Sequence, residues 1–167
     1  MESPIAKLFL AIQDRISDQI PEVKYIDQNL GQYMHEEFRK QMVFPAILID
    51  FPVVDFSEMQ GNSQFAEVTI VATMFHDAWN NSSSLTPLNI KVAGLQYLEQ
   101  NQKLFIALQG WNTEDCEALT RKQQKSQNAN ETGLRVQETT FTTQFEDRSC
   151  DDATPRIQLA YAPNSDS

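Results

Sequence analysis

Two histidines are the side chains of this sequence whose ordinary pKa suits proton transfer near neutral pH. Catalysis by a nucleophile usually needs such a base, held in place by a third group. His76 is followed by Asp77 where an apolar run gives way to a polar stretch, and Asp50 and Glu67 are carboxylates on or beside predicted strands. A small hydrolase or metal enzyme would have to be built around these four residues. We favour a simpler interpretation, in which His76 and Asp77 mark the exposed end of a strand.

The other histidine, His35, precedes Glu36 and Glu37, but this segment lacks the second histidine of the HExxH zinc motif. We expect its polar side chains to lie in water on a helical turn. No two of the five glycines are close enough to form a phosphate-cradling loop. The sequence therefore predicts a protein that is not an enzyme, with no catalytic residue, no bound metal and no cofactor.

Acidic side chains outnumber basic ones, and the formal net charge is −10. Asp50, Asp55, Glu58 and Glu67 lie on or beside predicted strands, where we expect them to be solvated loop and edge charges. A protein that holds DNA by neutralising its phosphates needs clustered Lys and Arg. The charge therefore disfavours DNA binding of that kind, although an acidic protein can lie near DNA without adhering to it.

Four basic side chains stand out against this acidic background, on the two arms of a predicted hairpin near its tip: Arg121, Lys122, Lys125 and Arg135. One interpretation is a solvated hairpin whose charges prevent edge-to-edge aggregation. The functional interpretation is a basic projection that docks on an acidic face of another subunit or partner. The sequence leaves both open.

Apolar side chains recur at spacings of three and four between residues 5 and 20, which predicts a helix that buries one face. Ser3 is placed to cap its start, with Pro4 in the first helical position and Pro21 as its stop. Apolar and β-branched runs predict strands at 23–27, 45–51 and 65–75, with a loop at 52–63.

A second helix is predicted over residues 87–109, with a break near Asn101 and Gly110 as its terminator. Its apolar stripe consists of Leu88, Val92, Leu95 and Leu98, continued by Leu104, Phe105, Leu108 and Trp111. Residues 116–126 and 134–146 are rich in Thr, Gln and β-formers around a turn segment, which predicts a long antiparallel hairpin.

The predicted fold class is α+β, with a central, mainly antiparallel sheet flanked by two main helices and a long C-terminal β-hairpin. We expect a single domain over residues 1–147 and an acidic, flexible tail over 148–167, in which 156–161 could form a short strand. No apolar run is long enough to cross a bilayer, and the N-terminus has no secretory signal pattern. Cys116 and Cys150 fit neither a zinc knuckle nor a redox motif. We expect free thiols, and a disulfide remains the open alternative.

This order of elements resembles that of the tail-terminator and tail-completion proteins of long-tailed bacteriophages and related particles, which join the tail to the head at the neck. The resemblance covers roughly residues 5–147. It is carried by the opening helix, by the strands FPAILIDF and AEVTIVATMF, by the helix TPLNIKVAGLQYLEQNQKLFIALQGW, and by the hairpin LTRKQQKSQ…GLRVQETTFTTQFED.

The resemblance implies a structural virion protein that forms a ring, usually a hexamer, capping the tail tube and joining it to the head-side connector or stopper protein. Its implied partners are further copies of itself, the tail tube protein and the connector, with DNA passing through as a strand that does not adhere and with no membrane. The implied location is the tail or neck of the virion, after assembly in the host cytoplasm. An adaptor of a related contractile or conjugative machine would share the fold and is the first alternative.

Overall fold

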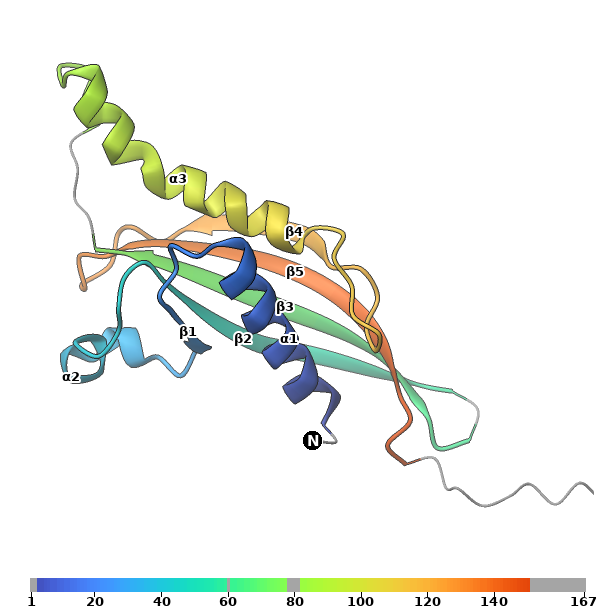
Figure 1. Ribbon diagram of the computed structural model, residues 1–167. Coiled ribbons are helices and arrows are strands. Elements are labelled where there is room, and N and C mark those ends of the chain that lie inside the picture. Colours follow the sequence, from blue (N-terminus) through green and yellow to red (C-terminus); the bar gives the residue numbers. More distant parts are fainter. Residues whose placement is uncertain (1–2, 60, 78–81, 151–167) are drawn as a thin grey trace, which may run out of the picture.

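Five strands form one sheet in the computed structural model, which describes residues 3–59, 61–77 and 82–150 (Figure 1). The strands are β1 (Tyr25–Gln28), β2 (Ala46–Glu58), β3 (Gln64–His76), β4 (Thr120–Ser126) and β5 (Arg135–Asp147). Their order across the sheet is β1-β2-β3-β5-β4, with β1 parallel to β2 and the other pairs antiparallel. The predicted α+β class with a mainly antiparallel sheet is therefore confirmed.

The first helix, α1 (Pro4–Gln19), forms where the sequence predicts it, within one residue at each end. The Ser3 hydroxyl accepts a hydrogen bond from the Ala6 N–H at 3.4 Å, so the predicted cap is present. Leu8, Ile12 and Ile16 are buried, as their spacing requires.

Strand β2 is longer than predicted, because it continues from the apolar run through Pro52 to Glu58. The loop predicted at 52–63 is therefore wrong over its first half. The pairing of β2 with β3 shifts between Asp50 and Val53, so Pro52 lies in the irregularity. Strand β1 reaches only as far as Ile49, which leaves Pro52 on a free edge where its missing N–H breaks no ladder.

The second main helix, α3 (Leu88–Leu108), is unbroken, so the break predicted near Asn101 is wrong. The Asn101 side chain donates to the Tyr97 carbonyl oxygen at 2.8 Å, one turn earlier, and so satisfies its amide nitrogen inside the helix. Gly110 ends the helix as expected, with a positive φ of 74°.

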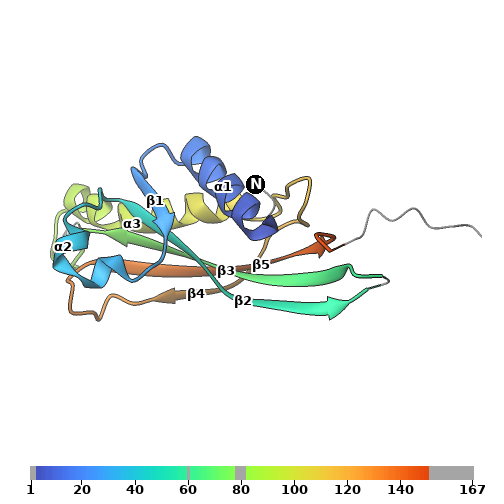
Figure 2. The same cartoon turned by 90° about the horizontal axis from the view of Figure 1, so that it is seen from below.

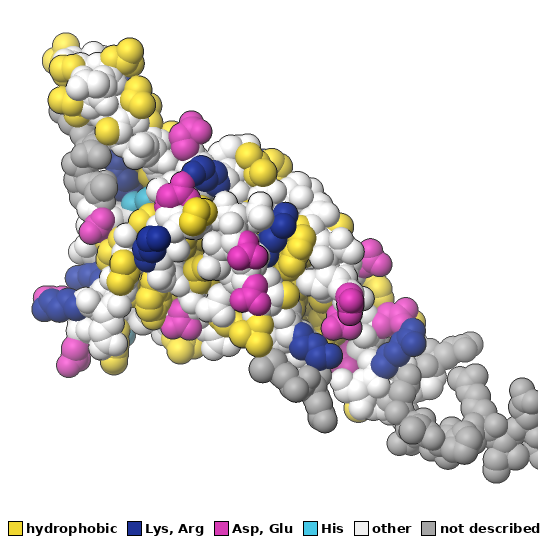
Figure 3. Space-filling model, in the orientation of Figure 1, with side chains coloured by type: hydrophobic (Ala, Val, Ile, Leu, Met, Phe, Trp, Pro, Cys, Tyr) yellow, Lys and Arg dark blue, Asp and Glu magenta, His cyan; other side chains and the backbone are white. Residues whose placement is uncertain are grey.

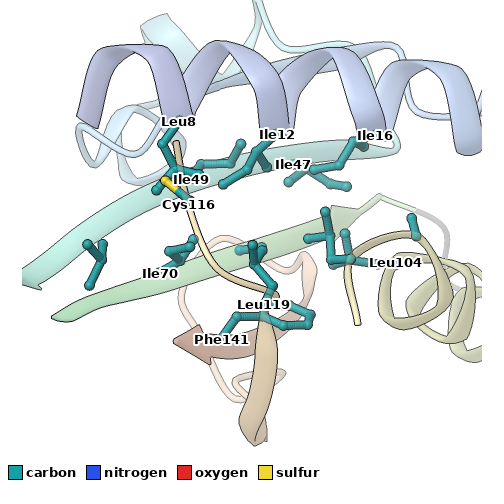
Figure 4. Close-up of a cluster of buried hydrophobic side chains, with 14 of the residues drawn as sticks. Leu8, Ile12, Ile16, Ile47, Ile49, Ile70, Leu104, Cys116, Leu119 and Phe141 are labelled. Atoms are coloured by element: carbon teal, nitrogen blue, oxygen red, sulfur yellow. The ribbon is translucent and has the colours of Figure 1, made fainter. Parts of the chain in front are cut away.

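Both main helices cover the same face of the sheet (Figure 2). The core lies between them and the strands (Figure 4). It is built from Leu8, Ile12 and Ile16 of α1, Leu104 and Leu108 of α3, and Ile47, Ile49, Ile70 and Phe141 of the sheet. Cys116 and Leu119 add to it from the segment before β4. That strand begins at Thr120 and not at 116, because the backbone of the preceding segment bonds to itself, from the Thr113 N–H to the Cys116 carbonyl oxygen and from the Leu119 N–H to the Trp111 carbonyl oxygen.

A smaller cluster lies on the opposite face, beneath the short helices η1 (Gln32–Met34) and α2 (Glu36–Arg39). It contains Met42, Ala46, Leu48, Phe75, Leu134 and Val136, with Tyr25, Tyr33 and Phe44 packed against it. Strands β4 and β5 form the predicted hairpin, with an irregularity between Arg121 and Gln123. The remainder of the sheet face that carries the smaller cluster has mostly polar and half-buried side chains.

The division into a domain over 1–147 and a tail over 148–167 stays a prediction, because residues 151–167, including the strand expected at 156–161, lie outside the described residues. Cys116 is buried and Cys150 is exposed, and both thiols are free. Among the described helices, none combines the length and the apolar character that crossing a membrane requires.

Two residues of α3 test this packing directly, because Leu104 is fully buried while Ile106 is 66% exposed. We expect Leu104→Ala to lower the free energy of unfolding by about 2–5 kcal/mol, since it leaves a cavity against the sheet. The matched variant Ile106→Ala should change it by less than about 0.5 kcal/mol. Urea unfolding of both variants measures the difference, and equal losses would contradict the assignment of the buried face.

Candidate functional site

The end of β3 holds the one histidine that the fold buries among the described residues. His76 is only 7% exposed, so the expectation of an exposed strand end is wrong for this side chain. Helix α3 covers it, and His76 Nε2 lies 2.6 Å from Oε1 of Gln100. A cavity of about 150 Å³ adjoins the ring, lined by Pro45, His76, Asp77, Ala93, Gly94, Gln96, Tyr97 and Gln100.

The surroundings of His76 favour its neutral form. Burial lowers the pKa of His76 below its ordinary value of 6.5, and the hydrogen bond to Gln100 opposes this shift only in part. The nearby Arg135 guanidinium lowers the pKa of His76 further. Arg135 itself lies 4.6 Å from the centre of the Tyr97 ring and donates to the Gly94 carbonyl oxygen at 3.3 Å. These contacts fix α3 on the end of the sheet.

The four residues of the enzyme alternative are not brought together. Glu67 precedes His76 by nine residues on β3, a separation of about 30 Å along an extended strand. Asp50 pairs with Val71, which lies about 17 Å from His76 along β3. The residues that line the cavity beside His76 include no serine, threonine or cysteine, and the Tyr97 phenol is the one hydroxyl among them. In the described part of the chain, no three His, Cys, Asp or Glu side chains gather as a metal site would need.

The four basic residues of the hairpin fall into two pairs. Arg121 and Arg135 are half-buried against α3, and the Arg121 guanidinium lies 3.7 Å from the centre of the Phe105 ring. The Arg121 N–H also donates to Oε1 of Gln109 at 2.9 Å. Lys122 and Lys125 instead extend into solvent from β4. The two arginines thus hold the helix on the hairpin, and the two lysines are available at the surface. A contact role for all four residues stays a prediction.

The N-terminal end of α3 extends beyond the sheet, and apolar side chains gather on this projecting end (Figures 1 and 3). Leu88 is 74% exposed and Val92 is 56% exposed. Leu85, just before the helix, and Leu95 and Leu98 within it are exposed as well. We call these five residues the α3 patch. The predicted apolar stripe is therefore present on the helix, but at this end nothing in the described chain covers it.

Helix α3 consequently has two different apolar faces. Its buried residues are Gly94 in the N-terminal half and Asn101, Leu104, Ala107 and Leu108 in the C-terminal half. Next to the α3 patch, a cleft of about 460 Å³ is lined by Val92, Leu95, Gln96, Glu99, Gln100, Lys103 and Glu22. A helix that is apolar on more than one side normally has more than one partner. Sequence periodicity reveals the stripe but cannot show that the sheet ends beneath it.

Several carboxylates share the sheet face that points away from α1 and α3. Asp55 lies directly opposite Glu67 on the neighbouring strand, and Asp50 lies opposite Val71 on the same face. Glu138 of β5 lies opposite Thr73 on this face as well. Like charges that face each other across a ladder are destabilising. Lys125 of β4 lies opposite Glu138, whereas nothing in the described chain neutralises Asp55 or Glu67 with an ion pair, so this face is acidic and open around these two carboxylates.

The buried position of His76 predicts a pH dependence of stability. The pKa of His76 is lower in the folded protein than in the unfolded chain, so the unfolded chain takes up the proton first as the pH falls. The free energy of unfolding that is present above pH 6.5 should therefore decrease below that pH. Urea unfolding at pH 7.5 and 5.5 should therefore show a smaller decrease for His76→Gln than for the wild type. His35→Gln removes an exposed histidine and is the matched control. Identical pH dependence in the wild type and His76→Gln would contradict the proposed burial effect.

Comparison with known proteins finds likeness in structure and none in sequence. No protein-family model matches the chain, and no curated protein sequence matches it. Among solved structures, a chain from the virion of a native gene transfer agent particle superposes with a TM-score of 0.48 at 10% sequence identity. The superposition covers 84% of this chain and 95% of that chain. A likeness at this identity and TM-score carries no conclusion about function, which has to be argued from the residues of this chain.

Proposed function

We propose that this protein is a structural subunit of a virion, and that it forms the ring of a tail terminator or neck component. In this role it caps the tail tube and joins it to the head-side connector or stopper protein. It performs no catalysis and needs no cofactor. The observation that carries the proposal is the α3 patch, which presents leucines and a valine to solvent on a helix that projects beyond its own sheet.

Scattered apolar side chains are ordinary on protein surfaces, but a contiguous group on a projecting element marks an interaction site. Leu88, Val92 and Leu95 follow at intervals of four and three residues, so they form one ridge along the helix. A ridge of this kind suits a partner groove in which helical side chains become buried. We take the partner to be a neighbouring copy, because a ring requires each subunit to bind the next.

The order of elements supports the same role. The opening helix, the β2 and β3 pair, the long helix α3 and the final hairpin follow one another as in the tail-terminator proteins that the sequence resembles. The residues of the enzyme alternative are dispersed over the sheet, which favours an assembly role over that alternative.

The acidic face of the sheet suits the passage of DNA. Asp50, Asp55 and Glu67 share the face that α1 and α3 leave open, and the chain as a whole carries a net charge of −10. Phosphate binding depends on neutralisation by basic side chains, so a surface of this charge repels the backbone. In the proposed ring, DNA is a passing strand that does not adhere.

The α3 patch provides the test of this function. We expect concentrated wild-type protein to form closed oligomers by light scattering and native mass spectrometry, and Leu88→Asp/Val92→Asp to remain monomeric with an unchanged unfolding midpoint. Both positions are exposed, and acidic residues are tolerated in the first turns of a helix, so folding should not suffer. Leu30→Asp, at a position that is 78% exposed far from α3 in the sequence, is the matched control and should assemble normally.

Two results would count against the proposal. A wild-type protein that stays monomeric at every concentration would contradict self-assembly. Normal oligomers of Leu88→Asp/Val92→Asp would show that the α3 patch is not the contact between copies.

A further inference from the structure

The outer half of β2 is a free edge of the sheet. Strand β1 pairs with β2 only from Ala46 to Ile49, so residues 51–58 have β3 on one side and no strand on the other within the described chain. Val53 and Phe56 are exposed along this half. Long exposed edges with apolar side chains are sites of pairing with another chain, and proteins normally cover or blunt them. Here the edge is left open over a length that suits a short strand.

Strand β4 forms the free edge at the other end of the strand order. It has seven residues, about the length of the open half of β2, and it contains no acidic side chain. Its ladder hydrogen bonds to β5 use alternate residues, so the main-chain groups of the intervening residues face outward. Lys122 and Lys125 are exposed on it, and neither makes an ion pair with any described residue. The Arg121 N–H already donates to Gln109 Oε1, so the basic edge is available for pairing from Lys122 to Ser126.

The two edges are complementary in charge. The open half of β2 carries Asp55 and Glu58, with Asp50 just before it, and all three are exposed. Asp55 also faces Glu67 across the ladder, where the two carboxylates repel each other. Lysines arriving on an added strand would place positive charge beside this pair and relieve the repulsion. Within one copy, β5 and β3 separate the two edges, so β4 does not pair with β2 of its own chain.

We propose that β4 of one copy pairs with residues 51–58 of β2 in the next copy, so that the sheet continues from subunit to subunit around the ring. The proposal rests on the self-assembly proposed above and adds a second contact between neighbouring copies to that of the α3 patch. The contact joins two different edges of the same chain, so it is heterologous and closes into a ring when the rotation between copies allows. Lys122 and Lys125 select the acidic edge, and main-chain hydrogen bonds provide the attachment.

Charge reversal at each edge tests this pairing. Lys122→Glu/Lys125→Glu makes both edges of a chain acidic, and Asp55→Lys/Glu58→Lys makes both edges basic. We expect each variant alone to associate at least tenfold more weakly than the wild type in sedimentation velocity. An equimolar mixture should regain association, because acidic and basic edges then alternate between the two kinds of chain. One chain with all four substitutions should also assemble, with the two charges exchanged.

The controls separate this inference from the proposed function. Lys7→Glu/Lys40→Glu makes the same change of charge at exposed positions on α1 and next to α2, and should associate like the wild type. The exposed ion pairs that it removes, Lys7 with Asp115 and Lys40 with Glu36, contribute little to stability. Unfolding midpoints show that each variant is folded. If the wild type associates but the edge variants associate equally well, or their mixture stays dissociated, then the edge pairing is overturned while self-assembly stands. If the wild type never associates, both proposals fail together.

Discussion

The packing of one long helix on a sheet that supports only part of it determines most of what this protein presents to its surroundings. Helix α3 has 21 residues, a length of about 31 Å, and its fully buried leucines are confined to the C-terminal half. That half closes the core against α1 and β5, and Arg121 stacks on its Phe105 ring. Nearer the N-terminus, Arg135 stacks on Tyr97 and donates to the Gly94 carbonyl oxygen. The first turns of the helix are held out beyond these contacts with an apolar ridge exposed.

The sheet likewise has fully paired central strands and partly unpaired edges. Strands β3 and β5 pair along their whole lengths, and their inward residues Val68, Ile70 and Phe141 are fully buried. Strand β1 covers only the first part of β2, and β4 is a polar edge. A sheet with unpaired edges of opposite charge can extend from copy to copy without rearrangement of its core. Stability and assembly thus use different residues, which is why the proposed contacts can be changed without unfolding the subunit.

Local signals in the sequence predict the elements well, because caps, prolines and periodicity act over a few residues. Ser3 and Pro4 mark the start of α1, and the alternation in β3 separates its two faces correctly. The extension of β2 through Pro52 was not predictable, since it depends on whether a strand lies beside that proline. The burial of His76 was missed for a related reason: the cover comes from Gln100 and Tyr97, more than twenty residues later. Likewise, the exposure of Leu88 and Val92 depends on where the sheet ends.

The candidate contact surfaces could also be predicted only in part from the sequence. Composition identifies the basic residues of the hairpin but cannot distinguish Lys122 and Lys125, which face solvent, from Arg121 and Arg135, which pack on α3.

The central claim is that copies of this chain close into a ring. Electron microscopy of the concentrated wild-type protein tests it most directly. The account predicts closed rings with a central hole wide enough for duplex DNA, and fields that contain only single subunits or open filaments would contradict it.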